Sequence, residues 1–149
     1  MDKGIYCLIF ENHACTCRVG SLGMLTFRPG WHIYVGSALG PGGLARVRRH
    51  FRLAKTRDRQ PVWHIDALLL SPDFRLDGCI CGYTEKKLEC ALAGEIRGDA
   101  VAGFGCSDCR CLSHLFQRTA DPRRDIIAAF HRLGLQCHEH KTQINGSQA

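Results

Sequence analysis

The chain has 149 residues, of which 45% are hydrophobic and 23% are charged. This length and composition are typical of one compact domain with its own core, and they are short for two domains. No stretch approaches the roughly 20 uncharged apolar residues of a membrane-spanning helix, and the apolar run near the N-terminus is shorter than the core of a secretory signal. The composition therefore predicts a soluble, cytoplasmic protein that makes no use of a membrane.

Strand-forming residues dominate the first part of the chain. Aromatic and β-branched residues recur between glycine- and proline-containing turns, a pattern that indicates short strands joined by tight connections. The second and third of these strands are expected to pair as a hairpin. The predicted strands are 4–11, 15–19, 24–27 and 31–35.

Helical spacing begins after the glycine-rich turn at 40–43. In residues 44–55 apolar side chains recur at i, i+3, i+7 and i+10, which predicts a helix buried along Leu44, Val47, Phe51 and Ala54. Two more helices are predicted further along the chain; the second has Asp121 and Pro122 where a cap and a first helical residue are favoured. Their ranges are 85–96 and 121–133.

The remaining segments complete an α+β (α/β) fold with a central, mainly antiparallel sheet of three to five strands flanked by helices. Residues 74–83 alternate as a strand does, whereas 63–70 is compatible with a helix or a strand. Residues 1–137 are expected to form a single domain. The last residues, 138–149, are polar and are expected to form a frayed tail.

Positive charge is concentrated in one segment. The whole chain carries a formal charge of +6, and residues 46–59 alone contain seven cations and one acid. A cluster of this kind is typical of a surface that follows nucleic-acid phosphates. A solvated helix face is the alternative interpretation. The cations are Arg46, Arg48, Arg49, Arg52, Lys55, Arg57 and Arg59.

Ten cysteines are present, which is a high count for this length. Without a secretory signal they are not expected to form a disulfide framework. The pairs Cys15/Cys17 and Cys79/Cys81 have strand spacing, and they are interpreted as small buried hydrophobic residues.

A second cysteine cluster lies close to a histidine. Four sulfur or nitrogen ligands fall within nine residues, so a tetrahedral zinc is conceivable there, although the spacing is not a common zinc-finger pattern and zinc is not favoured. The alternative is that Asp108 and the histidine border an active cleft while the thiols pack beneath it. The ligands would be Cys106, Cys109, Cys111 and His114.

Residues suited to phosphodiester cleavage gather in the first 90 positions. Two tyrosines occur in glycine-flanked tripeptides, Gly4-Ile5-Tyr6 and Tyr34-Val35-Gly36. Arg46 and His50 are four residues apart and therefore share one face of the predicted helix. Outside this order the two tyrosines would be interpreted as ordinary half-buried strand residues.

The ordered set of both tripeptides, Arg46-Val47-Arg48-Arg49-His50-Phe51 and a glutamate on a later helix resembles the GIY-YIG endonucleases. Three later pieces are similar to one branch of that superfamily, domain of unknown function 123 (the Uri type), and the resemblance extends over about residues 4–116. These pieces are Trp63-His64-Ile65-Asp66, Glu89-Cys90-Ala91-Leu92-Ala93 and residues 103–116.

The resemblance implies roles for five residues. Arg46 would bind and neutralise the scissile phosphate. Glu89 would ligate one hydrated Mg²⁺ or Mn²⁺ ion, because such hard cations prefer carboxylate oxygen. Tyr6, Tyr34 and His50 would position or deprotonate the attacking water; a tyrosine acting as the base would need a pKa below its ordinary value of about 10.

The implied function is metal-dependent endonucleolytic hydrolysis of DNA, in DNA repair or processing, with RNA left open as a substrate. Further nucleic-acid contacts are expected from Arg48, Arg49, Arg52, Lys55, Arg57 and His64.

Three features leave alternatives open. Glu85 and Glu95 compete with Glu89 for the metal. No asparagine occupies the late supporting position found in many active GIY-YIG members, for which Ser113 and His114 are the candidates here. A catalytically inactive nucleic-acid-binding module of the same fold, and a zinc- or redox-linked protein built on the Cys106–His114 loop, are therefore the rival hypotheses.

Overall fold

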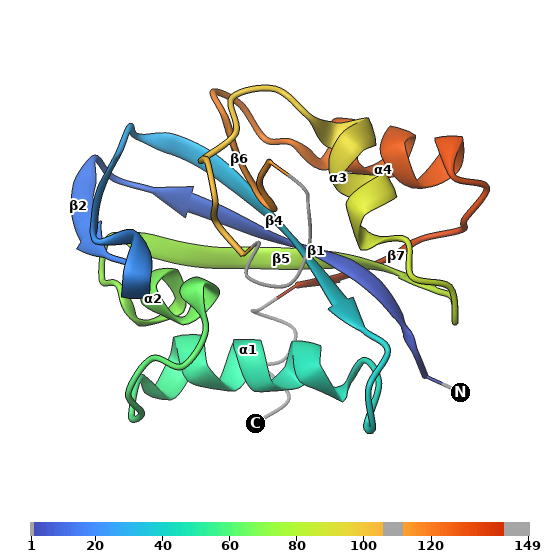
Figure 1. The fold of residues 1–149 in the computed structure, drawn as a ribbon, viewed down its shortest axis with the longest axis horizontal. Coiled ribbons are helices and arrows are strands. Elements are labelled where there is room, and N and C mark those ends of the chain that lie inside the picture. The colour runs from blue at the N-terminus through green and yellow to red at the C-terminus, as the bar shows by residue number, and fades with distance from the viewer. Residues whose placement is uncertain (1, 106–111, 142–149) are drawn as a thin grey trace.

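A five-stranded antiparallel sheet forms the centre of the molecule in the computed structural model, which describes residues 2–105 and 112–141 (Figure 1). The strand order is β6-β4-β1-β5-β7, and β2 and β3 form a separate two-stranded sheet. The strands are β1 (Gly4–Asn12), β2 (Cys15–Arg18), β3 (Met24–Phe27), β4 (Gly30–Ala38), β5 (Phe74–Tyr83), β6 (Leu115–Arg118) and β7 (His138–Lys141). The helices are α1 (Ala45–Thr56), α2 (His64–Leu70), α3 (Glu89–Ile96) and α4 (Arg123–Arg132).

Helices cover both faces of the sheet. Figure 1 shows α1 and α2 on one side and α3 and α4 on the other. The middle strand β1 is therefore buried on both faces, and its side chains alternate between two cores. Tyr6, Leu8 and Phe10 pack with α1 and α2, whereas Ile5 and Cys7 pack with α3 and α4. The predicted α+β fold is thus confirmed.

The hairpin expected between the two tripeptides is present as β2 and β3. Its pairing runs from Cys15 opposite Phe27 to Arg18 opposite Met24. Phe27 is 3% exposed and joins the core on the α1 and α2 side. The extra strand pair therefore lengthens the connection between β1 and β4 without entering the main sheet.

Three elements differ from the sequence-based expectation in their limits. Strand β4 is longer than predicted, because it pairs with β1 along the whole length from Gly4–Ala38 to Asn12–Gly30. Helix α3 begins at Glu89, since the Thr84 hydroxyl accepts a hydrogen bond from the Lys86 amide in a local turn instead of capping a longer helix. Residues 138–141, expected in a frayed tail, pair with Gly78–Cys81 of β5 as strand β7.

The buried side of α1 is also rotated from its predicted stripe. Val47, His50 and Leu53 are buried, whereas Phe51 and Ala54 are only partly so. The difference arises because α2 and β1 cover the side of the helix that carries His50, a contact between distant segments that local periodicity does not contain.

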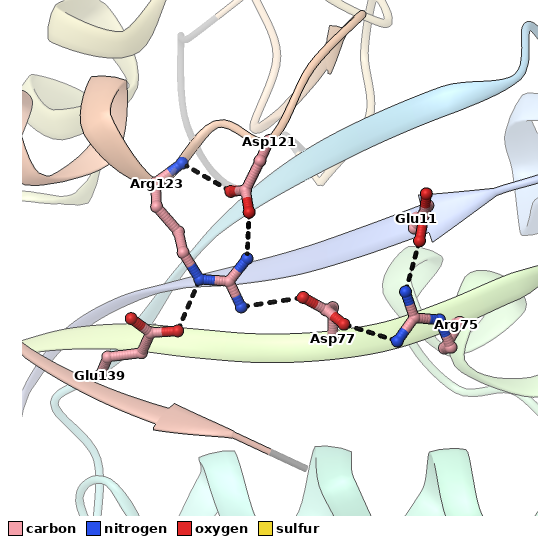
Figure 2. A network of polar contacts seen from close by, with 6 residues as sticks. All are labelled: Glu11, Arg75, Asp77, Asp121, Arg123 and Glu139. Atoms are coloured by element: carbon pink, nitrogen blue, oxygen red, sulfur yellow. Dashed lines mark hydrogen bonds and ion pairs between the residues drawn. The ribbon is translucent and has the colours of Figure 1, made fainter. Parts of the chain in front are cut away.

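Six charged side chains fasten β7 and α4 to the sheet (Figure 2). Arg123 of α4 lies 2.9 Å from carboxylate oxygens of both Asp77 and Asp121, and it also pairs with Glu139 of β7. Arg75 joins Asp77 to Glu11 of β1. The Arg123 side chain is only 19% exposed, so its ion pairs are screened less than those of a fully solvated arginine. This network helps to explain why residues 138–141 form a strand, because it links Glu139 of β7 through Arg123 to Asp77 of β5.

Among the helices of the described ranges, none has the length and apolar character required to cross a membrane.

Candidate active site

A small cavity of about 260 Å³ lies beside the sheet face that carries Tyr6 and Tyr34, the face that packs against α1 and α2. Residues from β1, β4, α1, the segment before α2, the start of α3 and the loop after it contribute to its walls. Tyr6, Tyr34, Arg46 and Glu89, chosen from the sequence, all line this one cavity. The lining is Tyr6, Tyr34, Gly36, Ser37, Arg46, Val62, Trp63, His64, Glu89, Gly105 and His114.

The two tyrosines are brought together by the register of β1 and β4. Tyr6 pairs with Gly36 and Leu8 pairs with Tyr34, so the tyrosines are diagonal neighbours on one face. Their ring centroids are 6.5 Å apart. Tyr6 is 1% exposed and Tyr34 is half-buried, so Tyr6 forms the floor of the cavity.

Glycine is required where the strands come closest. A Cβ on Gly36 would lie 2.3 Å from Cζ of Tyr6, and a Cβ on Gly4 would lie 2.2 Å from the carbonyl oxygen of Gly82. Both distances are shorter than any van der Waals contact. Gly4 therefore permits the close approach of two backbone segments, and Gly36 leaves room for the Tyr6 ring.

Tyr6 and His50 form a buried hydrogen-bonded pair. The Tyr6 hydroxyl lies 2.7 Å from Nε2 of His50, whose side chain is fully buried on α1. Burial raises the Tyr6 pKa well above 10; Tyr34 adds to this effect and Arg46 opposes it. Burial also lowers the His50 pKa to about 3, helped by Arg49. Both groups are therefore neutral at neutral pH, and the lowered tyrosine pKa that base catalysis by a phenolate needs is not found at Tyr6.

Two buried histidines make the folded state sensitive to acid. Burial lowers the pKa of His50 to about 3 and that of His32 to about 4, against roughly 6.5 in the unfolded chain. Between these values the unfolded chain binds protons that the folded chain excludes, so stability is lost as the pH falls below about 6.5. We expect the free energy of unfolding, measured with urea, to be about 4 kcal/mol lower at about pH 5 than at about pH 7.5.

Two single substitutions separate this effect from general acid denaturation. Nδ1 of His32 lies 2.8 Å from Oδ1 of Asn12, and a glutamine amide can also donate to that oxygen. His32→Gln should therefore lose about half of the pH dependence. His131→Gln, at an exposed position of α4, should retain all of it. A wild-type stability that is the same at both pH values would contradict the assignment of two neutral buried histidines.

Arg46 and Glu89 place opposite charges on the cavity wall. Arg46 lies in the first turn of α1, is exposed, and donates from Nη1 to the Ser37 carbonyl at 2.9 Å. Glu89 is the first residue of α3. Its Oε1 atom is buried and accepts no hydrogen bond within the described part of the chain, an unusual state for a carboxylate oxygen.

The other two glutamates considered for the metal lie elsewhere. Glu95 pairs with Arg132 of α4 at 2.6 Å, and Glu85 is exposed in the turn before α3. Neither lines the cavity. Geometry therefore separates Glu89 from its neighbours in the sequence.

The basic segment is divided between different surfaces. Arg46 reaches the small cavity, whereas Arg49 pairs with the buried Asp66 at 3.4 Å. The other four expected nucleic-acid contacts line a larger cavity of about 860 Å³ between α1 and the facing ends of β1 and β5. The predicted nucleic-acid contacts of Arg48, Arg52, Lys55 and Arg57 therefore lie at a surface other than the small cavity, and their role stays a prediction.

His64 lines the small cavity and also has a local role. Its Nδ1 accepts a hydrogen bond from the Gly105 amide at 2.9 Å, which holds the loop beyond α3 against α2. Trp63 and Val62, which were not chosen from the sequence, line the same cavity. Their signal in the sequence was weak, because one tryptophan before a helix is compatible with a core position.

The proposed second site is only partly described. Cys106, Cys109 and Cys111 lie outside the described residues. His114 is 6% exposed and lines the small cavity, where its Nε2 lies 3.7 Å from Sγ of Cys90. In residues 2–105 and 112–141, no group of three or more histidine, cysteine or acidic side chains is arranged to hold a metal ion.

Contacts distinguish the two candidates for a supporting residue, Ser113 and His114. Ser113 forms a local turn in which its hydroxyl donates to the Leu115 carbonyl and accepts from the Leu115 amide, so of the two candidates for a supporting residue only His114 faces the cavity. Cys79 and Cys81 are buried and free, as predicted, whereas Cys15 and Cys17 are free but only partly buried.

These observations define an α+β domain with two phenols, a guanidinium and a carboxylate around one small cavity. The family model described as "Domain of unknown function DUF123" matches residues 5–135, and the chain belongs to this family. No curated protein and no solved structure matches the chain.

Proposed function

We propose that this protein is a metal-dependent endonuclease of the GIY-YIG type that hydrolyses phosphodiester bonds in DNA, in DNA repair or processing. The observation that carries the proposal is the shared cavity of Tyr6, Tyr34, Arg46 and Glu89. Its volume of about 260 Å³ gives room for a phosphate group and several waters, each of which takes about 30 Å³.

The carboxylate fits a hard divalent cation. Oε1 of Glu89 is buried and has no hydrogen-bond partner among the described residues, and an ion with its own waters would satisfy it. One Mg²⁺ or Mn²⁺ ion fits this single carboxylate, because such ions retain several waters. When bound, the ion would neutralise charge on the phosphoryl oxygens and lower the pKa of a bound water.

The protein's own groups would bind phosphate and orient water. Arg46 is exposed at the cavity, and its guanidinium can donate to two oxygens of one phosphate. With the ring proton of His50 on Nδ1, the Tyr6 O–H donates to Nε2. The lone pairs of the Tyr6 oxygen then remain available to accept a hydrogen bond from water. Tyr6 would therefore orient the attacking water, because burial lowers the pKa of His50 to about 3 and makes its Nε2 a weak proton acceptor.

The test is cleavage of supercoiled, nicked, branched and single-stranded DNA, and of matched RNA, with Mg²⁺ or Mn²⁺. Arg46→Ala should lower the cleavage rate by at least about 100-fold, because it removes the cation that faces the charge of the transition state. Arg124→Ala is the matched control, since it removes the same charge from an exposed position of α4.

Two outcomes would contradict the proposal. Equal cleavage by wild type and Arg46→Ala would indicate a contaminating nuclease. Salt-sensitive DNA binding without cleavage in either metal would instead support the catalytically inactive binding module.

A further inference from the structure

Two large apolar side chains are exposed at the mouth of the candidate active site. Val62 is 76% exposed and the neighbouring Trp63 is 40% exposed, and both line the cavity that contains Arg46 and Glu89. Aromatic residues exposed beside a functional cavity are typical of ligand contacts. The position of this indole therefore suggests contact with a bound molecule.

A buried carboxylate fixes the backbone beneath the indole. Asp66 is 0% exposed, and its Oδ2 accepts hydrogen bonds from the amides of Val62 at 2.9 Å and Trp63 at 3.1 Å. Hydrogen bonds from Arg49 and from these two amides hold the Asp66 pKa below its ordinary value against the opposing effect of burial, so Asp66 stays charged. The exposed segment is thus anchored by an interaction that is costly to break.

The indole ring itself is contacted by three side chains of α1. The guanidinium carbons of Arg46 and Arg49 lie 4.9 Å and 4.3 Å from its centroid. These arginines are three residues apart on α1 and therefore share one face of that helix. The His50 ring also contacts the indole edge-on, at 6.1 Å between centroids. These contacts hold the indole in place, and Trp63 nevertheless remains 40% exposed.

We propose that Trp63 is a stacking platform for an unpaired nucleobase next to the phosphate bound by Arg46. The ligand class is single-stranded or locally unpaired nucleic acid, because a base inside a duplex has both faces covered by its neighbours. Arg46 touches the indole and lines the cavity, so one side chain links the stacking surface to the phosphate position. This inference rests on the proposed function only for the location of that phosphate.

Fluorescence of Trp63 tests the inference without cleavage. The chain has two tryptophans, so a Trp31→Phe background leaves Trp63 as the only reporter. In EDTA, an oligothymidylate should quench this fluorescence. The same oligonucleotide with abasic sites should bind about tenfold more weakly and quench less, because base–aromatic stacking is lost. A duplex of equal length should cause little quenching.

Substitutions measured with a labelled oligonucleotide give a second test. Trp63→Ala should weaken binding of the base-bearing strand about tenfold and leave binding of the abasic strand unchanged, and Trp63→Phe should be intermediate. Tyr83→Ala is the matched control, since Tyr83 is 54% exposed but does not line the cavity.

Equal affinity for the base-bearing and abasic strands, or equal quenching by the duplex, would overturn the stacking proposal. The abasic comparison needs no substitution at Trp63, so it remains decisive if Trp63→Ala does not fold. Cleavage without any effect of the bases would overturn this inference and leave the endonuclease proposal standing. Base-dependent quenching by a protein that cleaves nothing would support the inference and contradict the endonuclease.

Discussion

Glu89→Gln is expected to lower metal-dependent cleavage by about 1000-fold, because the charge stabilisation that a metal supplies is worth several kcal/mol. The substitution keeps the shape of the side chain and removes its charge. The unpaired Oε1 atom would become part of a neutral amide, a poor ligand for a hard cation. The measurement is the single-turnover rate at saturating Mg²⁺, compared with wild type.

Metal binding gives an independent check of the same residue. If Mn²⁺ binds only the folded protein at Glu89, it should raise the melting temperature of wild type and leave that of Glu89→Gln unchanged. Glu85→Gln is the matched control, because this substitution removes an equal charge from an exposed turn four residues away from Glu89. Full activity in Glu89→Gln would exclude this carboxylate as the metal ligand.

Gly36→Ala is expected to destabilise the fold by about 3 kcal/mol and to reduce cleavage strongly. The added Cβ would lie 2.3 Å from Cζ and 2.5 Å from the hydroxyl oxygen of Tyr6. Tyr6 is 1% exposed and cannot turn into solvent, so either the ring or strand β4 must shift. A shift of the ring would lengthen the 2.7 Å contact with His50. Urea denaturation measures the stability, and the cleavage assay measures the site.

The control for Gly36→Ala is Gly94→Ala. A Cβ on Gly94 meets no atom within 4 Å, and the residue is exposed within α3. This substitution should therefore stabilise the protein by about 0.5–1 kcal/mol, since alanine is the better helix former. A Gly36→Ala protein as stable as wild type would show that the strands are not as closely packed around Tyr6 as described.

The sequence determined the parts of the fold that depend on local pattern. The helix at 44–55 and the strand at 4–11 each carry their own periodicity, and both lie within two residues of the observed α1 and β1. The order of the two tripeptides, the helix arginine and Glu89 also predicted a set of residues that line one cavity. These features can be predicted because they depend only on residues that are neighbours in the chain, or on the order of motifs along it.

Only the tertiary structure decided the contacts between distant segments. Strand β7 is ordered because β5 offers it a free edge, although the polar residues 138–141 have little strand character of their own. The neutral state of Tyr6 and His50 depends on burial by elements far apart in the sequence. Because of the orientation of α1, Arg46 lines the small cavity and Arg52 lines the larger one.

The physical reason is the same in each case. Periodicity shows which residues of an element are apolar, but strand order and register determine which elements meet and what each polar side chain faces. Trp63 illustrates this: its sequence neighbours do not distinguish a core tryptophan from the exposed, anchored ring found between Arg46, Arg49 and solvent.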